Sequence, residues 1–500
     1  MPPVARLSWN VVFPLILSAA AGGCTHANQR LNDPGVQLER RAGNRTFAAT
    51  AVNVAPIHSE DTQRVRPEGG ESAGGDDTSA AARGQSPDVR PDGYFVGLAL
   101  SGGGSRSANF SAACMFQLQR LGMLQHVDYI SSVSGGSLTA AYYCLHGDNG
   151  WNPGRVQKKL THSFATDLIV GTLIPWNMPV LWFSDWDRSD LLSDSFASVL
   201  FSRKGRELTF KDLRADRPRL LINATDLQTG RRFIFCNETF DELNSDLSKY
   251  PVADAVAASA AVPVLLHHVT LRDFSTRFKQ YRHLVDGGVA DNLGVQTLAE
   301  TYTAQLEAAA KHNLPDPYPR GAVLIVIDAR TEYDARLSHR GDVTFFESLS
   351  TGAGLTSTVL LNRASSATLA ELVVQNANDN RTAGEIREDI DELERTGGVT
   401  LEGRNGKPVR IIHLALSHVD DLSTLPHHSF HEHVNNISTY FNISSEEAFN
   451  LYEAAELLVR EQFEAHLARL AREIGGEGDM GEPERTEATP TPQPVTKPSP

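Results

Sequence analysis

The sequence predicts an α/β fold with a mostly parallel central sheet, and three observations indicate it. Residues 322–327 form a continuous run of Ala, Val, Leu and Ile, which is typical of a strand buried on both faces of a parallel sheet. Strand-like runs alternate along the chain with helix-like stretches, such as 108–121 and 294–311. The strand-like run 94–100 leads through glycines into a helix-like stretch. Further strands are predicted over residues 126–133, 219–225 and 233–235.

Composition and charge narrow the class of protein. The 500 residues include 46 Lys and Arg against 61 Asp and Glu, which gives a net charge of −15. This balance argues against nucleic-acid binding, which depends on clustered Lys and Arg. It also gives no overall attraction to anionic lipid, so membrane contact is expected to come from acyl chains or apolar surface. No apolar run reaches the ~18 residues of a transmembrane helix, which excludes a polytopic membrane protein.

The N-terminus is predicted to be a bacterial secretory signal. Residues 11–21 are mostly apolar, follow the basic residue Arg6, and run into the letters AGGC, which end at Cys24. Small residues directly before a cysteine resemble the lipobox, in which the cysteine is lipidated and becomes the new N-terminus. We therefore expect Cys24 to anchor the protein in the bacterial cell envelope, facing the periplasm. Thr25 carries no inner-membrane retention signal, which favours the outer membrane, whereas the alternative is an ordinary signal peptide with a chance cysteine.

One folded domain is predicted between two disordered ends. Residues 58–92 and the C-terminal tail are rich in Gly, Ser, Pro and charged side chains, and such segments cannot offset the entropy of ordering. A helix over 446–474 has apolar residues at steps of three and four, and Ser444 with Glu447 forms a capping box. The predicted boundaries are 1–23, signal peptide; 24–92, lipidated N-terminus and disordered tether; 93–330, catalytic core; 331–474, a mostly helical extension of the same domain; and 475–500, disordered tail.

Two turns that follow predicted strands carry residues typical of an active site. The first is S-G-G-G-S-R, from Ser101 to Arg106, whose glycines can turn their N–H groups toward one side at the start of a helix. An anion would bind there, as a nucleotide phosphate or as a reaction oxyanion. The loop lacks the Lys-Ser/Thr of a P-loop and the spaced glycines of a dinucleotide site. The second turn, residues 131–137, indicates a nucleophile elbow with Ser134 at its centre and Ser132 in place of the usual first glycine.

The third motif lies at Asp286, after the glycine loop and the elbow serine in the sequence. Asp286 is followed by two glycines, which by itself predicts only a turn. The order G-G-G-x-R, elbow serine, D-G-G resembles that of the patatin-like phospholipases. Residues 224–230 and 258–263 resemble two further segments of that family, so the resemblance covers about residues 95–330.

The resemblance implies a fold and a reaction. The fold would be a patatin-like three-layer α/β/α arrangement with a C-terminal helix. The activity would be that of a lipid acyl hydrolase, of phospholipase A or lysophospholipase type, acting on phospholipid or another acyl lipid with no cofactor and no metal. The reaction would use a Ser134–Asp286 dyad, with the pKa of Asp286 raised by burial. The implied oxyanion hole consists of the amides of Gly102, Gly103, Gly104 and Gly135. Arg106 would steady the loop or bind a substrate phosphate, or else lie on the surface.

Two other functions stay open at this stage. One is a Ser-His-Asp hydrolase, whose base would be His312, His339, His413 or His418. The other is an inactive envelope scaffold that has kept the fold. A segment over 168–186 with three tryptophans is either a lid or a buried cap, and the histidines near 427–433 lack the spacing of a metal site.

Overall fold

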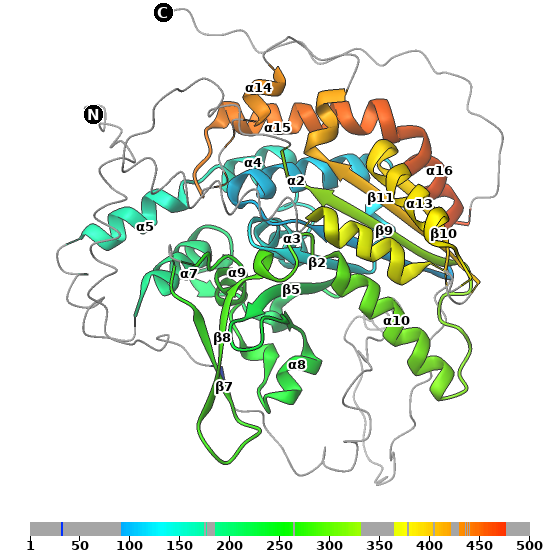
Figure 1. Cartoon of the computed structure of the whole chain (residues 1–500). Helices are drawn as coiled ribbons and strands as arrows, with labels where there is room; N and C mark the ends of the chain where they lie inside the picture. Colours follow the sequence, from blue (N-terminus) through cyan, green and yellow to red (C-terminus); the bar gives the residue numbers. More distant parts are fainter. Residues whose placement is uncertain are drawn as a thin grey trace, which may run out of the picture.

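The computed structural model describes residues 32–33, 92–174, 177, 186–263, 266–331, 365–377, 380–403, 406–421, 430–435, 437, 439 and 441–476. The predicted signal peptide, Cys24, all but the first two residues of the C-terminal tail, most of the tether, Trp176 and Trp182 lie outside these residues. Within them, a mixed sheet lies between two layers of helices (Figure 1). This confirms the predicted three-layer α/β/α fold. None of the described helices is long and apolar enough to cross a bilayer.

The central sheet has nine strands among the described residues, in the order β10-β11-β9-β1-β2-β5-β8-β7, with β6 also paired to β5. The five strands β11, β9, β1, β2 and β5 run parallel. β10, β6 and β8 pair antiparallel with members of this group, and β7 pairs antiparallel with β8. The strands are β1 (Tyr94–Leu100), β2 (Tyr129–Val133), β5 (Arg219–Asp226), β6 (Arg232–Phe235), β7 (Val269–Asp273), β8 (Gln280–Asp286), β9 (Gly321–Asp328), β10 (Gly398–Glu402) and β11 (Pro408–Ala415). A separate hairpin consists of β3 (Ser202–Arg203) and β4 (Arg206–Glu207).

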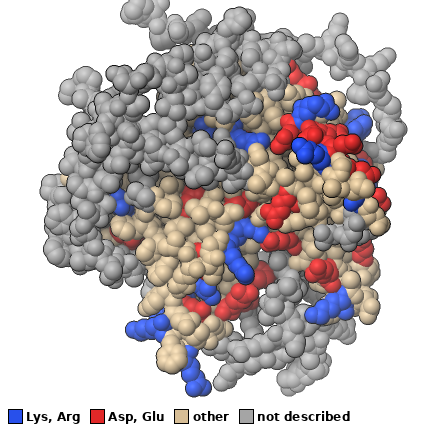
Figure 2. All heavy atoms as spheres, viewed as in Figure 1, with Lys and Arg blue, Asp and Glu red and all other residues tan. Residues whose placement is uncertain are grey.

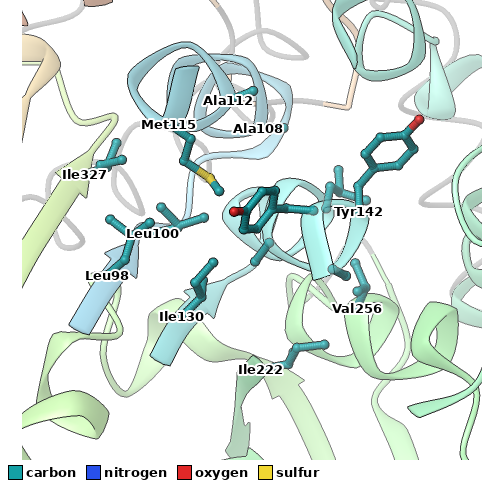
Figure 3. Close-up of a cluster of buried hydrophobic side chains, with 14 of the residues drawn as sticks. Leu98, Leu100, Ala108, Ala112, Met115, Ile130, Tyr142, Ile222, Val256 and Ile327 are labelled. Carbon is teal, nitrogen blue, oxygen red and sulfur yellow. The ribbon is translucent and has the colours of Figure 1, made fainter. Parts of the chain in front are cut away.

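Both faces of the sheet are buried, because successive side chains of a strand point to opposite faces. On β1, Leu98 and Leu100 pack into one apolar cluster, whereas Phe95 and Ala99 pack into the other. Figure 3 shows the first cluster, in which strand side chains point toward Met115 and its neighbours on α2. That face is covered by α2 (Gly104–Arg120), α3 (Gly135–Leu145) and α9 (Val252–Ser259), and the other by α10 (Val295–Lys311), α13 (Ala383–Thr396) and the helical residues 365–376.

The predicted C-terminal helix is interrupted. Its capping box is present, with the amide of Glu447 donating to Ser444 Oγ at 3.1 Å. The helix then divides into α15 (Ser445–Leu458), a π-helical turn Val459–Phe463, and α16 (Glu464–Ile474). The wider turn buries both Val459 and Phe463, and it lets the apolar stripes of the two halves face the core. The remaining helices are α4 (Pro153–Leu160), α5 (Phe164–Leu173), α7 (Arg188–Val199), α8 (Asn237–Glu242) and α14 (Phe430–Asn435).

The extension over 331–474 contains two strands that the sequence analysis did not predict. β11 pairs in parallel with β9, and β10 closes that edge of the sheet. Val399 and Leu401 of β10 alternate with exposed side chains, and Val409 and Ile411 of β11 pack beside them. The extension is therefore part of the central sheet as well as a helical layer.

The predicted tether is docked to the fold at one point. Asn32 is 3% exposed and forms a paired contact with the backbone of β7. Its side-chain amide donates to the carbonyl oxygen of Arg272 at 2.9 Å and accepts from the amide of Arg272 at 2.6 Å. The carbonyl oxygen of Asp33 accepts a hydrogen bond from Ser245 Oγ at 2.6 Å. Asn32 and Asp33 of the 24–92 segment are therefore held against the fold.

Candidate active site

Ser134 lies in a sharp turn between β2 and α3. Its backbone has φ 49° and ψ −120°, a region that residues other than glycine seldom adopt. The following glycines permit the turn because backbone packs directly against them. A Cβ on Gly135 would lie 2.0 Å from the carbonyl oxygen of Gly104, and one on Gly136 would lie 2.7 Å from that of Ser101. This strand–turn–helix geometry holds the Ser134 side chain at the carboxyl end of β2.

Asp286 meets Ser134 at this edge of the sheet. Asp286 is the last residue of β8, it lies opposite Ala224 on β5, and its side chain forms a hydrogen bond with that of Ser134. The carboxylate also accepts from the amide of Gly288 at 2.7 Å. Burial raises the pKa of Asp286 to about 6, and these two hydrogen bonds offset only part of that effect. The carboxylate is therefore a stronger base than an exposed aspartate, whose pKa is about 3.9.

The glycine loop brings a second helix start to the same place. Gly103, with φ 133°, caps α2, and a Cβ on Gly102 would lie 3.5 Å from that of Ser134. Since Gly135 also touches Gly104, the N-termini of α2 and α3 meet beside the serine. Both helix ends favour negative charge there.

The predicted oxyanion donors divide into two groups. The amide of Gly102 donates to the carbonyl oxygen of Asn292 at 2.8 Å, so the structure removes this amide from the predicted set. Gly102 is still needed at this position, because a Cβ there would lie 2.5 Å from Asn292 Oδ1. The amides of Gly103, Gly104 and Gly135 donate to no acceptor in the described part of the chain. These three remain the candidate donors.

Arg106 is a buried structural residue and does not lie on the surface. Its guanidinium donates to the carbonyl oxygen of Ile437 at 3.1 Å and to Thr331 Oγ1 at 3.4 Å. Both partners belong to the C-terminal extension. Arg106 therefore ties that extension to the first turn of α2, next to the glycine loop.

A buried polar network supports the elbow, and the sequence analysis did not assign its members. Ser259 accepts from the amide of Ser134 at 2.8 Å and donates to the carbonyl oxygen of Asn223 at 2.6 Å. The Asn223 amide donates to Ser131 Oγ at 2.8 Å, and Thr225 donates to the carbonyl oxygen of Asp286 at 2.9 Å. The only sequence signal for Ser259 and Thr225 was their place in the two secondary motifs, at 258–263 and 224–230.

The alternative histidine bases lie elsewhere. In the described part of the chain no histidine hydrogen-bonds to Ser134 or Asp286. His413 pairs with Asp328 at 3.2 Å, and its ring meets that of His418 edge-to-face. It lies three strands from β2, or about 14 Å at ~4.8 Å per strand. His312 follows the last turn of α10, about 25 Å from that helix's start near Ser131. His339 lies outside the described residues.

The structure shows no feature of a metal site within the ranges it describes. No group of three or more His, Cys, Asp or Glu side chains there could hold a metal ion. His427 and His428 lie outside those ranges. The cysteines Cys114, Cys144 and Cys236 are all free.

The chain is similar to known proteins in sequence and in structure. Residues 98–299 match the family model described as patatin-like phospholipase, and a search of the curated proteins found no match. Human GIVD cytosolic phospholipase A2 is 13% identical, with a TM-score of 0.44, and the match covers 77% of this chain and 60% of that one. VipD from Legionella pneumophila is 12% identical, with a TM-score of 0.27, over 75% of this chain and 68% of VipD. This chain therefore spans about 60% of the length of the human protein. The stretch that matches the patatin-like phospholipase family, residues 98–299, includes the glycine loop, Ser134 and Asp286.

Proposed function

We propose that this protein is a lipid acyl hydrolase of phospholipase A or lysophospholipase type, which cleaves carboxylic ester bonds with Ser134 and Asp286. The observation that carries the proposal is the hydrogen bond between these two side chains at the place where two helix N-termini meet. A nucleophile, a base with a raised pKa and free amides occupy one small region. Ester hydrolysis requires these three groups together.

The proposed reaction has two halves. Ser134 Oγ attacks the ester carbonyl carbon while its proton passes to the Asp286 carboxylate, and the amides of Gly103, Gly104 and Gly135 bind the oxyanion. The tetrahedral intermediate collapses as Asp286 returns the proton to the leaving alcohol, which leaves an acyl-serine. Water then attacks the acyl-serine with Asp286 again as the base, which releases the fatty acid and regenerates Ser134.

We also propose that Cys24 is lipidated and holds the protein in the bacterial envelope, on the periplasmic face and preferably at the outer membrane. The sequence before Cys24 supports this proposal. An acyl anchor would keep the enzyme next to a phospholipid substrate. Each buried CH₂ of such an anchor contributes about 0.8 kcal/mol to membrane binding.

Substitution of the dyad tests the proposed function. Ser134→Ala is expected to lower turnover of p-nitrophenyl butyrate and of phospholipid at least 10³-fold, because it removes the nucleophile. Ser198→Ala is the matched control, since Ser198 lies on α7 and donates only to a neighbouring carbonyl oxygen. An inactive parent protein, or a Ser134→Ala variant as active as the parent, would contradict the proposal and favour the scaffold.

A further inference from the structure

The β7–β8 hairpin projects past the edge of the sheet that carries the active site. β8 pairs with β5 only from Leu284 to Asp286, and Leu284 lies opposite Asp226 at the carboxyl end of β5. The strand upstream of Leu284 therefore extends beyond the sheet, as Figure 1 shows. β8 begins at Gln280, four residues before Leu284 or about 13 Å farther out at ~3.3 Å per residue, and Phe278 lies in the turn beyond it. Since β2 and β5 are parallel, Ser134 lies at that same edge.

The tip of this hairpin, residues 274–279, combines an exposed aromatic ring with positive charge. Phe278 is 80% exposed, the highest value among the large apolar side chains that the structure describes. Exposed Arg277 and Lys279 flank it. Figure 2 shows Lys or Arg side chains on the protrusion at the lower left. The acidic residue Asp273 is buried at the base of the tip and interacts with Arg282 and Ser275. The tip is therefore basic although the whole chain carries −15.

Exposed apolar side chains continue from the hairpin toward the active site. Leu227 is 58% exposed, and its amide donates to the carbonyl oxygen of His283 on β8. Val289, also 58% exposed, lies three residues after Asp286. These side chains give the edge around the site an apolar rim next to the basic tip.

The docked residue Asn32 places the predicted anchor near this hairpin. Asn32 binds the backbone of Arg272 on β7, and it comes only eight residues after Cys24. Eight residues span at most about 28 Å. An acyl chain on Cys24 would therefore keep β7 close to the bilayer surface.

We propose that the β7–β8 hairpin is a membrane-docking element that places Phe278 among the headgroups of an anionic phospholipid bilayer. Arg277 and Lys279 bind lipid phosphates, and the edge of the sheet that carries Ser134 faces the bilayer. An exposed aromatic side chain flanked by basic residues suits the interface between water and lipid. The choice of lipid as the partner rests on the proposed function. The local charge also revises the expectation, drawn from the net charge, that the protein has no electrostatic attraction to lipid.

A fluorescent probe at the tip tests the proposal. The full chain carries Cys24→Ser, so that no acyl chain is attached, Ser134→Ala, so that the lipids stay intact, and Phe278→Cys labelled with nitrobenzoxadiazole. The remaining thiols react slowly because Cys114 and Cys144 are buried and burial raises the pKa of Cys236 to about 12. Vesicles of phosphatidylglycerol and phosphatidylethanolamine are expected to shift the probe's emission to the blue and raise its intensity. Phosphatidylcholine vesicles or 0.5 M NaCl should largely abolish the shift.

The control probe replaces the other most exposed phenylalanine. Phe449 is 60% exposed on α15, which lies on the side of the molecule away from the hairpin (Figure 1). A probe at Phe449→Cys is expected to keep the emission of an aqueous environment. Equal shifts at both positions, or no shift at either, would overturn the proposal.

Charge reversal tests the role of the basic residues separately. The double substitution Arg277→Glu and Lys279→Glu is expected to weaken vesicle binding about 10-fold or more, whereas Arg469→Glu with Arg472→Glu on α16 should leave it unchanged. Equal affinity of the two variants would overturn the electrostatic contact. These readouts measure binding and not turnover. The parent protein can hydrolyse p-nitrophenyl butyrate while the probe on the hairpin shows no shift and charge reversal leaves vesicle binding unchanged. That result would reject the docking element and leave the proposed function intact.

Discussion

At the scale of single residues, the proposed chemistry depends on the ionisation of Asp286. Its carboxylate is buried beside Ser134, and its pKa is raised to about 6. Only the ionised form can accept the serine proton. The same burial that makes the carboxylate a better base makes its charged form less stable in the folded protein.

The pH dependence of the reaction follows from this pKa. The value of kcat/KM for a soluble ester is expected to rise about tenfold per pH unit below 6 and to reach a plateau above pH 7. Stopped or continuous assays with p-nitrophenyl butyrate between pH 4.5 and 8 measure the profile. A flat profile across this range would show that Asp286 is not the base.

The same pKa predicts a change in folding stability. Because the folded pKa lies above the unfolded value of about 3.9, the ionised carboxylate costs stability above pH 6, and this cost disappears near pH 4. Asp286→Asn should therefore raise the free energy of unfolding by on the order of 1–3 kcal/mol at pH 8 and by much less at pH 4. Urea unfolding at both pH values measures it.

Asp212→Asn is the control, and its expected change in the free energy of unfolding has the opposite sign. Hydrogen bonds from Arg206 lower the pKa of Asp212 to about 2, so its carboxylate stabilises the folded protein above pH 4. This variant should lose stability at pH 8. A destabilised Asp286→Asn protein at pH 8 would contradict the assigned burial cost.

At the scale of elements, the site depends on how closely α2 and α3 approach each other. Gly135 fits against the carbonyl oxygen of Gly104 only because it has no side chain. This contact sets the spacing between the serine and the amides of the glycine loop. It involves backbone on both sides, so a larger residue cannot be accommodated by a rotamer change.

Substitution of Gly135 should therefore affect both activity and folding. Gly135→Ala is expected to lower kcat at least 10²-fold and to lower Tm, because its Cβ would lie 2.0 Å from that oxygen. Gly154→Ala on α4 is the control, since a Cβ there meets nothing within 4 Å. Ester assays and thermal unfolding of both variants provide the measurement. Parent-like activity of Gly135→Ala would show that the two helices can separate without loss of the site.

The elements show where sequence reasoning succeeds. β1 has the predicted bounds, and β9 extends the predicted run by one residue at each end, because strands buried on both faces are apolar throughout. β8 was missed since its first half, beginning at Gln280, projects into solvent and has no apolar pattern. β10 is a short edge strand in which buried and exposed side chains alternate, and β11 lies between β10 and β9. The Gly102 amide donates to the carbonyl oxygen of Asn292, which is far away in the sequence, so no local sequence pattern reveals this hydrogen bond.

At the scale of the whole molecule, the proposed envelope location depends on lipidation of Cys24. Mass spectrometry of the N-terminal peptide is expected to show a chain that begins at Cys24 and carries acyl groups, and Cys24→Ser should abolish that species and release the protein from the detergent phase. Cys236→Ser is the matched control and should keep the modification. An unmodified N-terminal peptide that begins at another residue would contradict lipidation.

The docking of Asn32 on β7 has a consequence for the segment that follows it. The chain contacts the fold at Asn32 and again where β1 begins at Tyr94. In the proposed lipidated protein, residues 25–31 therefore set how far β7 can stand from the membrane, and the length of the segment between Asn32 and Tyr94 does not enter.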